Sequence, residues 1–248
     1  MTYPSHLQMI LVGLLASGCS TILQSRLRMN RFDNPEALGK SHGEFFAQSS
    51  RAVSVAHVPD IDEDPPRLNS VALDQEGSWS AGWGHGLMER WDLQLSYPWF
   101  ARTKFQLLGK SRQAAKKNNF SLAVGLGGGL MESVADDIEY DGDSNRGEMD
   151  LTLVEASVMV GWRPWEKVLL SASAFGQDIT GRGKLQTETD DKYKLKQHGG
   201  MMGYSAGLHF FLGTVVLSGD YTRSDVHWSN GAKDASFDSF AGRLAIRY

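Results

Sequence analysis

The C-terminal part of the chain holds a small set of residues that could do covalent chemistry. The tetrad "HWSN" at 227–230 contains His227 and Ser229, and Asp238 follows in "FDSF". A serine hydroxyl is a poor nucleophile until a base within hydrogen-bond reach accepts its proton, and histidine is the usual base. Brought together by neighbouring elements, a serine, a histidine and an aspartate would form a nucleophilic site.

The same tetrad resembles the H-x-S-N signature of the outer-membrane lipid A 3-O-deacylases. The resemblance implies that His227 is the general base, Ser229 the nucleophile and Asp238 the acidic residue that orients the histidine, with outer-leaflet lipid as the substrate. A polar loop with an ordinary surface histidine is the alternative. Asp225 and His227 also resemble the D-x-H half of the omptin proteases, with the acidic run at 60–64 as a possible partner.

The elements that would position these residues show a period of two. In "RWDLQLSY" at 90–97, Trp91, Leu93 and Leu95 share one face, while polar residues share the other. Such alternation is typical of strands with one apolar and one polar face, and no segment shows a convincing amphipathic helix. The sequence predicts ten strands, at about residues 43–56, 76–85, 90–97, 101–109, 119–128, 149–162, 167–178, 200–212, 214–223 and 237–248.

The connections between these strands alternate between short turns, such as the one at 163–166, and long polar links. The long links are 59–75, 130–148, 179–199 and 224–236. Outer-membrane barrels are built in this way, with lipid-facing apolar residues alternating with inward polar ones. We therefore predict an all-β fold, an antiparallel transmembrane β-barrel of ten strands over residues 43–248. Eight strands, or a water-soluble sandwich, are the alternatives.

The last strand carries a further signal. One of its faces carries Phe240, Leu244, Ile246 and Tyr248. This face resembles the C-terminal recognition strand of outer-membrane barrels, which implies contact with the barrel-assembly machinery. Ten strands place both ends of the barrel, and with them a lipid on Cys19, on the short-turn, periplasmic side and the long loops outside the cell. By the same parity His227, Ser229 and Asp238 face lipid, and outer-membrane lipids and lipopolysaccharide are the expected partners.

The N-terminus has the features of an export signal. A short apolar core at 9–16 is followed by the small residues Ser17 and Gly18 and by Cys19, the only cysteine. This pattern resembles the lipobox of bacterial lipoproteins, which implies a signal peptide at 1–18, acylation of Cys19 and, because Ser20 follows, sorting to the outer membrane. An ordinary signal peptide with an incidental cysteine is the alternative. The polar, aperiodic residues 19–42 are expected to form a tether.

The inward faces of the strands predict a polar lumen. In the hairpin at 90–109 the expected pairs are Ser96–Arg102, Gln94–Lys104 and Asp92–Gln106. The expected luminal residues are Asp92, Gln94, Arg102, Lys104, Glu155, His209, Asp220, Arg243 and Arg247. We expect ion pairs such as Asp220 with Arg243 or Arg247. Because a ten-stranded barrel is only slightly wider than one that side chains fill, a satisfied polar plug is predicted, with a narrow pore as the alternative.

Composition narrows the function further. A formal net charge of −4 with 22% charged residues gives no reason to expect nucleic-acid binding. The acidic stretch at 136–145 lacks the glycine spacing and distal glutamate of a calcium loop and is expected to be solvated, with no metal or other cofactor. The sequence therefore predicts a non-enzymatic barrel with a structural, surface-interaction or narrow-channel role. A lipid ester hydrolase is the alternative.

Overall fold

The structure is a computed structural model that describes residues 23–28, 31–60, 67–97, 99–132, 134–135, 146–186, 192–229 and 235–248. The expected signal peptide, Cys19 and the acidic stretch at 136–145 lie outside these residues. In the described part of the chain, no helix is long and apolar enough to cross a membrane.

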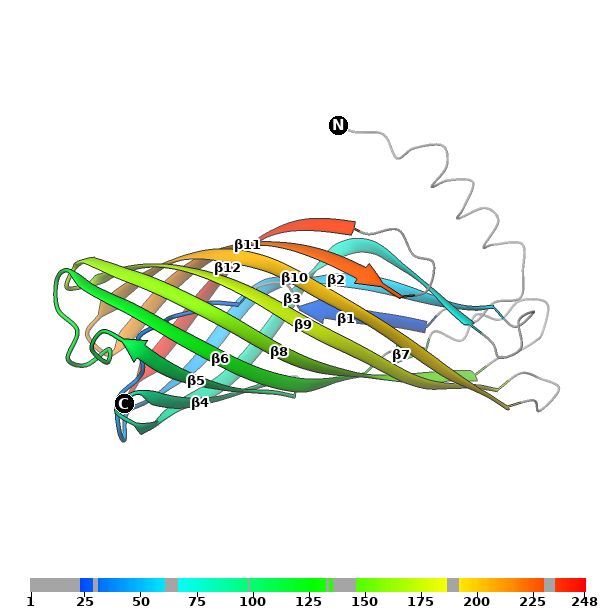
Figure 1. Cartoon of the computed structure of the whole chain (residues 1–248), viewed down its shortest axis with the longest axis horizontal. Helices are drawn as coiled ribbons and strands as arrows, with labels where there is room; N and C mark the ends of the chain where they lie inside the picture. Colours follow the sequence, from blue (N-terminus) through cyan, green and yellow to red (C-terminus); the bar gives the residue numbers. More distant parts are fainter. Residues whose placement is uncertain are drawn as a thin grey trace, which may run out of the picture.

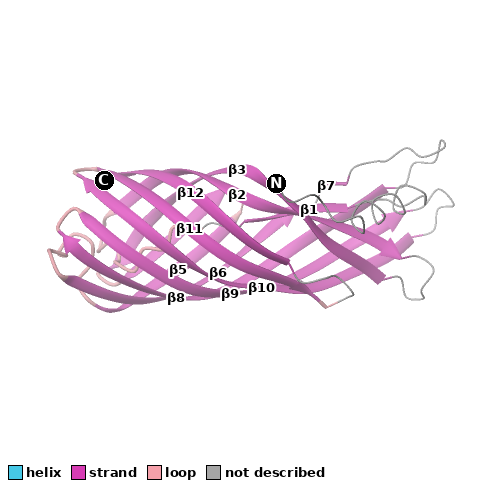
Figure 2. Cartoon of the chain, turned by 90° about the horizontal axis from the view of Figure 1, so that it is seen from above, coloured by secondary structure: helices cyan, strands magenta, loops and turns pink. Residues whose placement is uncertain are grey.

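Ten antiparallel strands form a closed barrel (Figures 1 and 2). They are β2 (Gly43–Asp60), β3 (Arg67–Met88), β4 (Trp91–Tyr97), β5 (Phe100–Leu108), β6 (Asn119–Glu132), β8 (Arg146–Trp165), β9 (Val168–Gln186), β10 (Lys192–Leu212), β11 (Val215–Trp228) and β12 (Ala235–Arg247). The lower parts of β12 and β2 pair and close the wall. Two further strands extend the sheet at its upper end. β1 (Leu23–Arg28) pairs with the upper part of β2, and β7 (Val134–Ala135) pairs with β1. The predicted ten-stranded barrel is confirmed.

Several strands are much longer than a membrane requires. A spanning strand needs about 9–11 residues, whereas β3 has 22 and β10 has 21. In three of the segments expected to be long loops, 59–75, 179–199 and 224–236, most residues are therefore in strands; β9 and β10, for example, stay paired out to Gln186 and Lys192. The loop expectation was wrong because polar outward residues were interpreted as loop, although the alternation continues there with its polarity reversed.

In the half of the barrel near the short turns, the outside is apolar. On β8 the outward side chains from Val154 to Trp162 are exposed and apolar, a rise of about 20 Å at roughly 3.3 Å per residue and a tilt of about 40°. Exposed aromatic side chains border this band at Trp91, Phe120, Trp162, Trp165 and Tyr248 on the short-turn side, and at Tyr97, Trp99, Tyr204 and Phe240 on the other. An apolar belt with aromatic borders on a closed sheet identifies this half as the membrane-spanning part.

Beyond the belt the polarity inverts. On β8, Leu151 and Leu153 are buried inside, while Asp150 and Thr152 are exposed outside. The upper parts of β1 to β3 lie across from those of β8 to β11, and their inner side chains form one hydrophobic cluster. It comprises Leu27, Val53, Val55, Met149, Leu151, Leu153, Phe175, Ile179, Leu195, Met201, Val226 and Trp228. We call this part, outside the belt and with an apolar core, the projecting head.

One polar group is enclosed within the head. His57 is fully buried, and its Nδ1 lies 2.6 Å from the Ser70 hydroxyl. Burial lowers the pKa of His57 to about 4, so the ring is neutral at physiological pH. Ser70 also accepts a hydrogen bond from Gln197 of β10, and the Trp228 ring packs edge-on to His57 at 5.3 Å. These contacts join β2 and β3 to β10 and β11 across the head.

The β4–β5 hairpin corrects the expected register. The structure pairs Asp92 with Lys104 and Gln94 with Arg102, so the predicted register is wrong by two residues. A shift of two leaves every side chain on the same face, and the alternation alone therefore cannot distinguish the two registers. The observed one brings the Lys104 ammonium to 2.9 Å from the Asp92 carboxylate.

The head core can be tested with adjacent residues on opposite faces of β8. Leu151→Ala removes a fully buried side chain and should lower the free energy of unfolding by about 2–5 kcal/mol, because it leaves a cavity. Thr152→Ala on the exposed face should change it by less than about 0.5 kcal/mol. Urea unfolding of the protein refolded into detergent micelles measures both. Equal effects of the two changes would contradict the inverted polarity of the head.

Candidate functional site

The barrel lumen is occupied by the chain's own N-terminal segment. Leu23 pairs with His57 at the long-loop end, and the chain then descends to Gly43, where β2 begins beside Tyr248 at the short-turn end. Residues 31–39 on this path are buried or half-buried. We call them the plug segment. The structure thus differs from the expected free tether at 19–42, and the described chain does not start on the short-turn side.

The upper part of the plug segment is held by a cluster of buried charges. Asp33 forms ion pairs with Arg31, at 2.9 Å, and with Arg102 of β5, and it accepts a hydrogen bond from Ser173 of β9. Arg31 in turn donates to both carboxylate oxygens of Glu155 on β8, at 2.5 and 2.6 Å. Carboxylates and guanidinium groups thus alternate across the lumen, and each charge has a counter-charge within reach.

A second cluster holds the plug segment nearer the short turns. Glu36 is fully buried and receives two hydrogen bonds from the Arg163 guanidinium, one of them at 3.0 Å. Asn119 donates to the same carboxylate at 3.0 Å. Arg163 lies 4.3 Å above the Phe211 ring, so an aromatic face supports the cation. A buried arginine near the short-turn end of β8 is thereby neutralised by the plug segment.

Backbone groups of the plug segment are satisfied by inward side chains of β4 and β5. Lys104 donates to the carbonyl oxygens of Asn34 and Glu36, each at 2.8 Å. The amide of Leu38 donates to both oxygens of Asp92 at 3.0 Å, and the amide of Ala37 donates to Gln106 at 2.8 Å. An irregular segment can lie inside a barrel only if the wall supplies such partners, because unpaired buried amides are costly.

The link between β5 and β6, residues 109–118, closes the short-turn mouth. It is longer than the other turns on that side because it folds inward as a cap. Its Arg112 amide donates to the carbonyl of Ala37 at 2.7 Å, and the Arg112 guanidinium pairs with Glu44 at 2.6 Å. Arg243 of β12 pairs with the other oxygen of Glu44, also at 2.6 Å. This carboxylate joins the cap to the barrel wall.

The predicted luminal residues lie on the inside of the wall, with partners that partly differ from those expected. Arg243 pairs with Glu44, while Asp220 accepts a hydrogen bond from Thr222 at 2.6 Å. Arg247 donates to the Gly213 carbonyl at the turn. His209 lies 2.9 Å from the hydroxyls of both Ser171 and Ser218. The expectation for Arg243 did not include Glu44, the carboxylate with which it pairs.

Sequence reasoning missed a group of luminal residues: Arg31, Asp33, Glu36, Glu44, Arg112 and Arg163. Most lie outside the alternating strand segments, where the period of two gives no information about direction. One signal was present: the link at 109–118 is too long and too rich in charges for an ordinary short turn.

Little space remains in this network. A cavity of about 30 Å³ lies beside Gln94, Arg102 and Lys104, which is room for about one water molecule. Above it the hydrophobic core of the head fills the space between the strands. The polar plug segment and the apolar head therefore block the lumen at two successive levels.

The proposed catalytic residues lie on the outer surface and are not assembled. Ser229 donates through its hydroxyl to the His198 carbonyl at 2.9 Å. Asp238 accepts a hydrogen bond from Tyr221 at 2.5 Å and lies across the β11–β12 ladder from Arg223. Because Arg223 is four residues before His227, the Asp238 carboxylate is about 13 Å along the strand from that histidine.

Asp225 and His227 also point outward. Asp225 accepts a hydrogen bond from Ser236 at 2.5 Å, so it does not form part of a site at the barrel mouth. Residues 61–64 of the acidic run lie outside the described residues. Among the described residues, no cluster of His, Cys, Asp or Glu side chains could hold a metal ion.

Comparisons with known proteins give a loose structural likeness. No family model and no curated protein matches the chain. Among solved structures, the attachment invasion locus protein Ail of Yersinia pestis aligns at 10% identity and a TM-score of 0.36, covering 84% of this chain and 99% of that one. Neisserial surface protein A aligns at 10% and 0.33, over 82% and 97%. The outer-membrane protease OmpT of Escherichia coli aligns at 7% and 0.38, over 92% and 96%. Scores this low carry no argument, so fold and membrane position rest on the chain's own geometry.

The strength of the plug contacts can be measured by a double-mutant cycle on Asp33 and Arg102. Each single change to Ala removes one of the two counter-charges of a buried group and should cost up to about 3–5 kcal/mol of unfolding free energy, whereas the double change should cost clearly less than the sum. The exposed ion pair between Arg26 and Glu76, with a nitrogen–oxygen distance of 2.9 Å, is the matched control. It should couple by less than about 1 kcal/mol. Additive losses for Asp33 and Arg102 would show that the pair does not hold the plug segment.

Proposed function

We propose that the protein is a non-enzymatic, non-conducting outer-membrane β-barrel that holds its projecting head at the cell surface. The observation that carries this proposal is the filled lumen, in which the plug segment is bound by buried ion pairs with residues of β5 and β8. A barrel whose lumen is filled by its own chain has only its outer surfaces available to contact other molecules. Structural and surface-interaction roles are therefore favoured over a narrow channel.

The shape of the molecule supports a role at the surface. Strands of 18–22 residues exceed the roughly 10 residues that span a membrane, and the excess lies almost wholly in the head. The head has an apolar core and a polar outside, as expected of a part that stands in water. We place it on the extracellular side, with the short turns in the periplasm, outer-membrane lipids and lipopolysaccharide around the belt, and assembly machinery engaging β12.

No specific observation favours the hydrolase alternative. Asp238 is engaged with Tyr221, and Ser229 donates to a backbone carbonyl. A serine nucleophile needs its hydroxyl proton directed at a base, whereas the Ser229 hydroxyl donates to the His198 carbonyl. His227 and Ser229 do share one outward surface, which matters for binding rather than for catalysis.

A lipid anchor on Cys19 is part of the proposal and has its own test. Leu23 lies at the long-loop end, and four residues span at most about 14 Å, so acyl chains on Cys19 would enter the leaflet at that end. Cells expressing the protein should incorporate radiolabelled palmitate into it, and Cys19→Ser should abolish the label. Ser17→Thr, a control beside the cysteine, should retain it. Equal label in the Cys19→Ser protein would refute acylation at this residue.

The absence of conduction can be tested in planar lipid bilayers. The wild-type barrel should give flat current traces, because charged and apolar groups fill the lumen at two levels. A variant lacking residues 23–41 loses the plug segment and also β1, which carries Leu27 of the head core and pairs with the upper part of β2. Both levels are thereby opened, so this variant should show discrete openings, which show that the assay can detect a pore in this wall. Openings of the wild-type protein at comparable frequency would overturn the proposal.

A further inference from the structure

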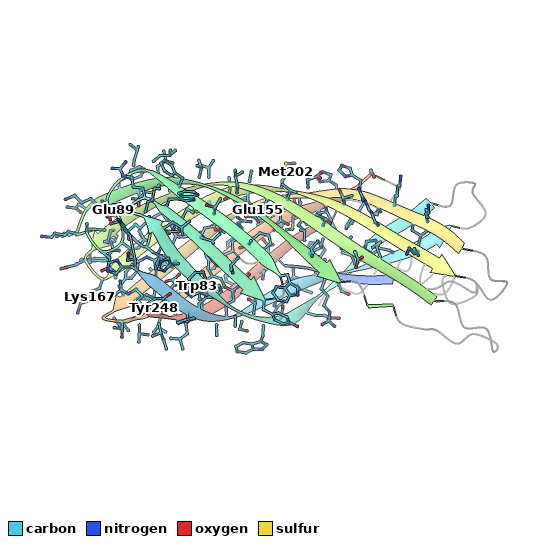
Figure 3. All side chains as sticks on the ribbon, turned by 90° about the horizontal axis from the view of Figure 1, so that it is seen from below. Trp83, Glu89, Glu155, Lys167, Met202 and Tyr248 are labelled. Atoms are coloured by element: carbon cyan, nitrogen blue, oxygen red, sulfur yellow. The ribbon has the colours of Figure 1, made fainter. Side chains whose placement is uncertain are left out.

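The outer surface carries a hollow where the apolar belt meets the head. It extends from β6 to β11 and has a volume of about 520 Å³, within the range of roughly 300–1,000 Å³ found for small-molecule sites. Most of its lining is apolar. Met202 stands on its rim and points away from the barrel (Figure 3).

Small residues create this hollow. Ala156 of β8 pairs with Gly176 of β9, and Gly200 of β10 is two residues from Met202, which pairs with Gly176 on its other side. A Cβ placed on Gly176 would meet nothing within 4 Å. Larger side chains, Val154 and Met202, stand around them and are exposed. On a lipid-facing surface, such a depression between larger apolar groups suits the chain of a lipid.

A second hollow of about 560 Å³ adjoins the first on the side of the head. It is lined by Thr180, Gly181, Arg182, Lys196, Gln197, His198 and Ser229. The first hollow is lined by His198 and Ser229 as well, so the two are continuous. The pair therefore forms one amphipathic site at the edge of the belt, with an apolar lower part and a cationic upper part.

The cationic side chains at and above the upper hollow lie opposite one another and repel each other. Across the β9–β10 ladder Arg182 lies opposite Lys196, and on the next outward level Lys184 lies opposite Lys194. All four side chains are exposed on the same outer face. Like charges directly opposite one another destabilise a sheet.

Acidic neighbours do not offset this charge fully. On β8, Asp150 lies opposite Arg182 and Glu148 lies opposite Lys184, and Asp178 lies 3.5 Å from His198. Four cations thus face three acidic neighbours, one of which is engaged by a histidine. A multivalent anion at this place would compensate the remaining positive charge.

We propose that these two hollows bind one phosphorylated acyl lipid of the leaflet on the head side. An acyl chain lies in the lower hollow over Gly176 and Gly200, and the phosphate meets Arg182 and Lys196 in the upper one. The position fits because phosphate groups of a bilayer lie just above its hydrocarbon edge, which is where the outward residues of β9 change from Ala174 and Gly176 to Asp178 and Arg182. The site is independent of whether the lumen conducts.

The test uses the full chain in detergent micelles and native mass spectrometry of the intact protein. The probe is dioleoyl phosphatidic acid, which has both a phosphate monoester and acyl chains. We expect saturable binding of about one molecule per barrel, weakened at least about tenfold by Arg182→Gln with Lys196→Gln. Gly176→Leu, which fills the lower hollow, should weaken binding to a similar extent.

Matched variants control for charge, shape and folding. Lys117→Gln with Lys167→Gln removes the same charge at the short-turn end, where Lys167 is exposed (Figure 3). Gly219→Leu adds the same side chain at another open outward glycine, whose Cβ would also meet nothing within 4 Å. Both controls should bind as the wild type does. Migration of unheated against heated protein on gels confirms that every variant is folded.

Three outcomes would overturn the proposal. Binding of dioleoylglycerol as tight as that of phosphatidic acid would show that the phosphate is not recognised. Displacement by inorganic phosphate at equal concentration would show a site for a free anion and not for a lipid. Wild-type affinity in both Arg182→Gln with Lys196→Gln and Gly176→Leu would place any bound lipid elsewhere on the belt.

Discussion

Buried positive charge in the barrel is the constraint on which the rest of the structure depends. Arginines from β5 and β8 point into a space too narrow for bulk water, and an unpaired charge there would be very costly. The plug segment supplies Asp33 and Glu36 as their counter-charges. Neutralising the wall therefore draws the N-terminal segment inward, and that segment in turn occupies the lumen.

One closed sheet is surrounded by lipid at the belt and by water at the head. In the belt its outer face is apolar and its inner face polar, whereas in the head the inner face is apolar and the outer face polar. The same strands can serve both parts because the direction of a side chain follows only from the period of two, while its chemistry is free to change along the strand. The change on β8 falls between Thr152 and Glu155, and it marks the edge of the membrane.

The two surface hollows and the exposed polar residues that line them lie at this edge. His198, His227 and Ser229 lie there on the outer face, beside small residues that hollow the surface and below a group of cations. Among the described residues, the cavity beside the plug segment is about 30 Å³, much smaller than the hollows on the outer surface. Recognition is thus moved from the interior of the barrel to its outer surface and its head.

The sequence by itself determined the ten strands and the faces of most of their residues, since the alternation of apolar and polar side chains is local and Leu217, Phe210 or Leu244 can be assigned outward from it. It did not determine register, because the pairings of Gln94 with Lys104 and with Arg102 differ by two residues and preserve both faces. It likewise could not give the height of Asp238 relative to His227. Only the tertiary structure decided that the N-terminal segment lies in the lumen, because an aperiodic charged segment finds its place through partners that are distant in the chain, such as Arg102 and Arg163.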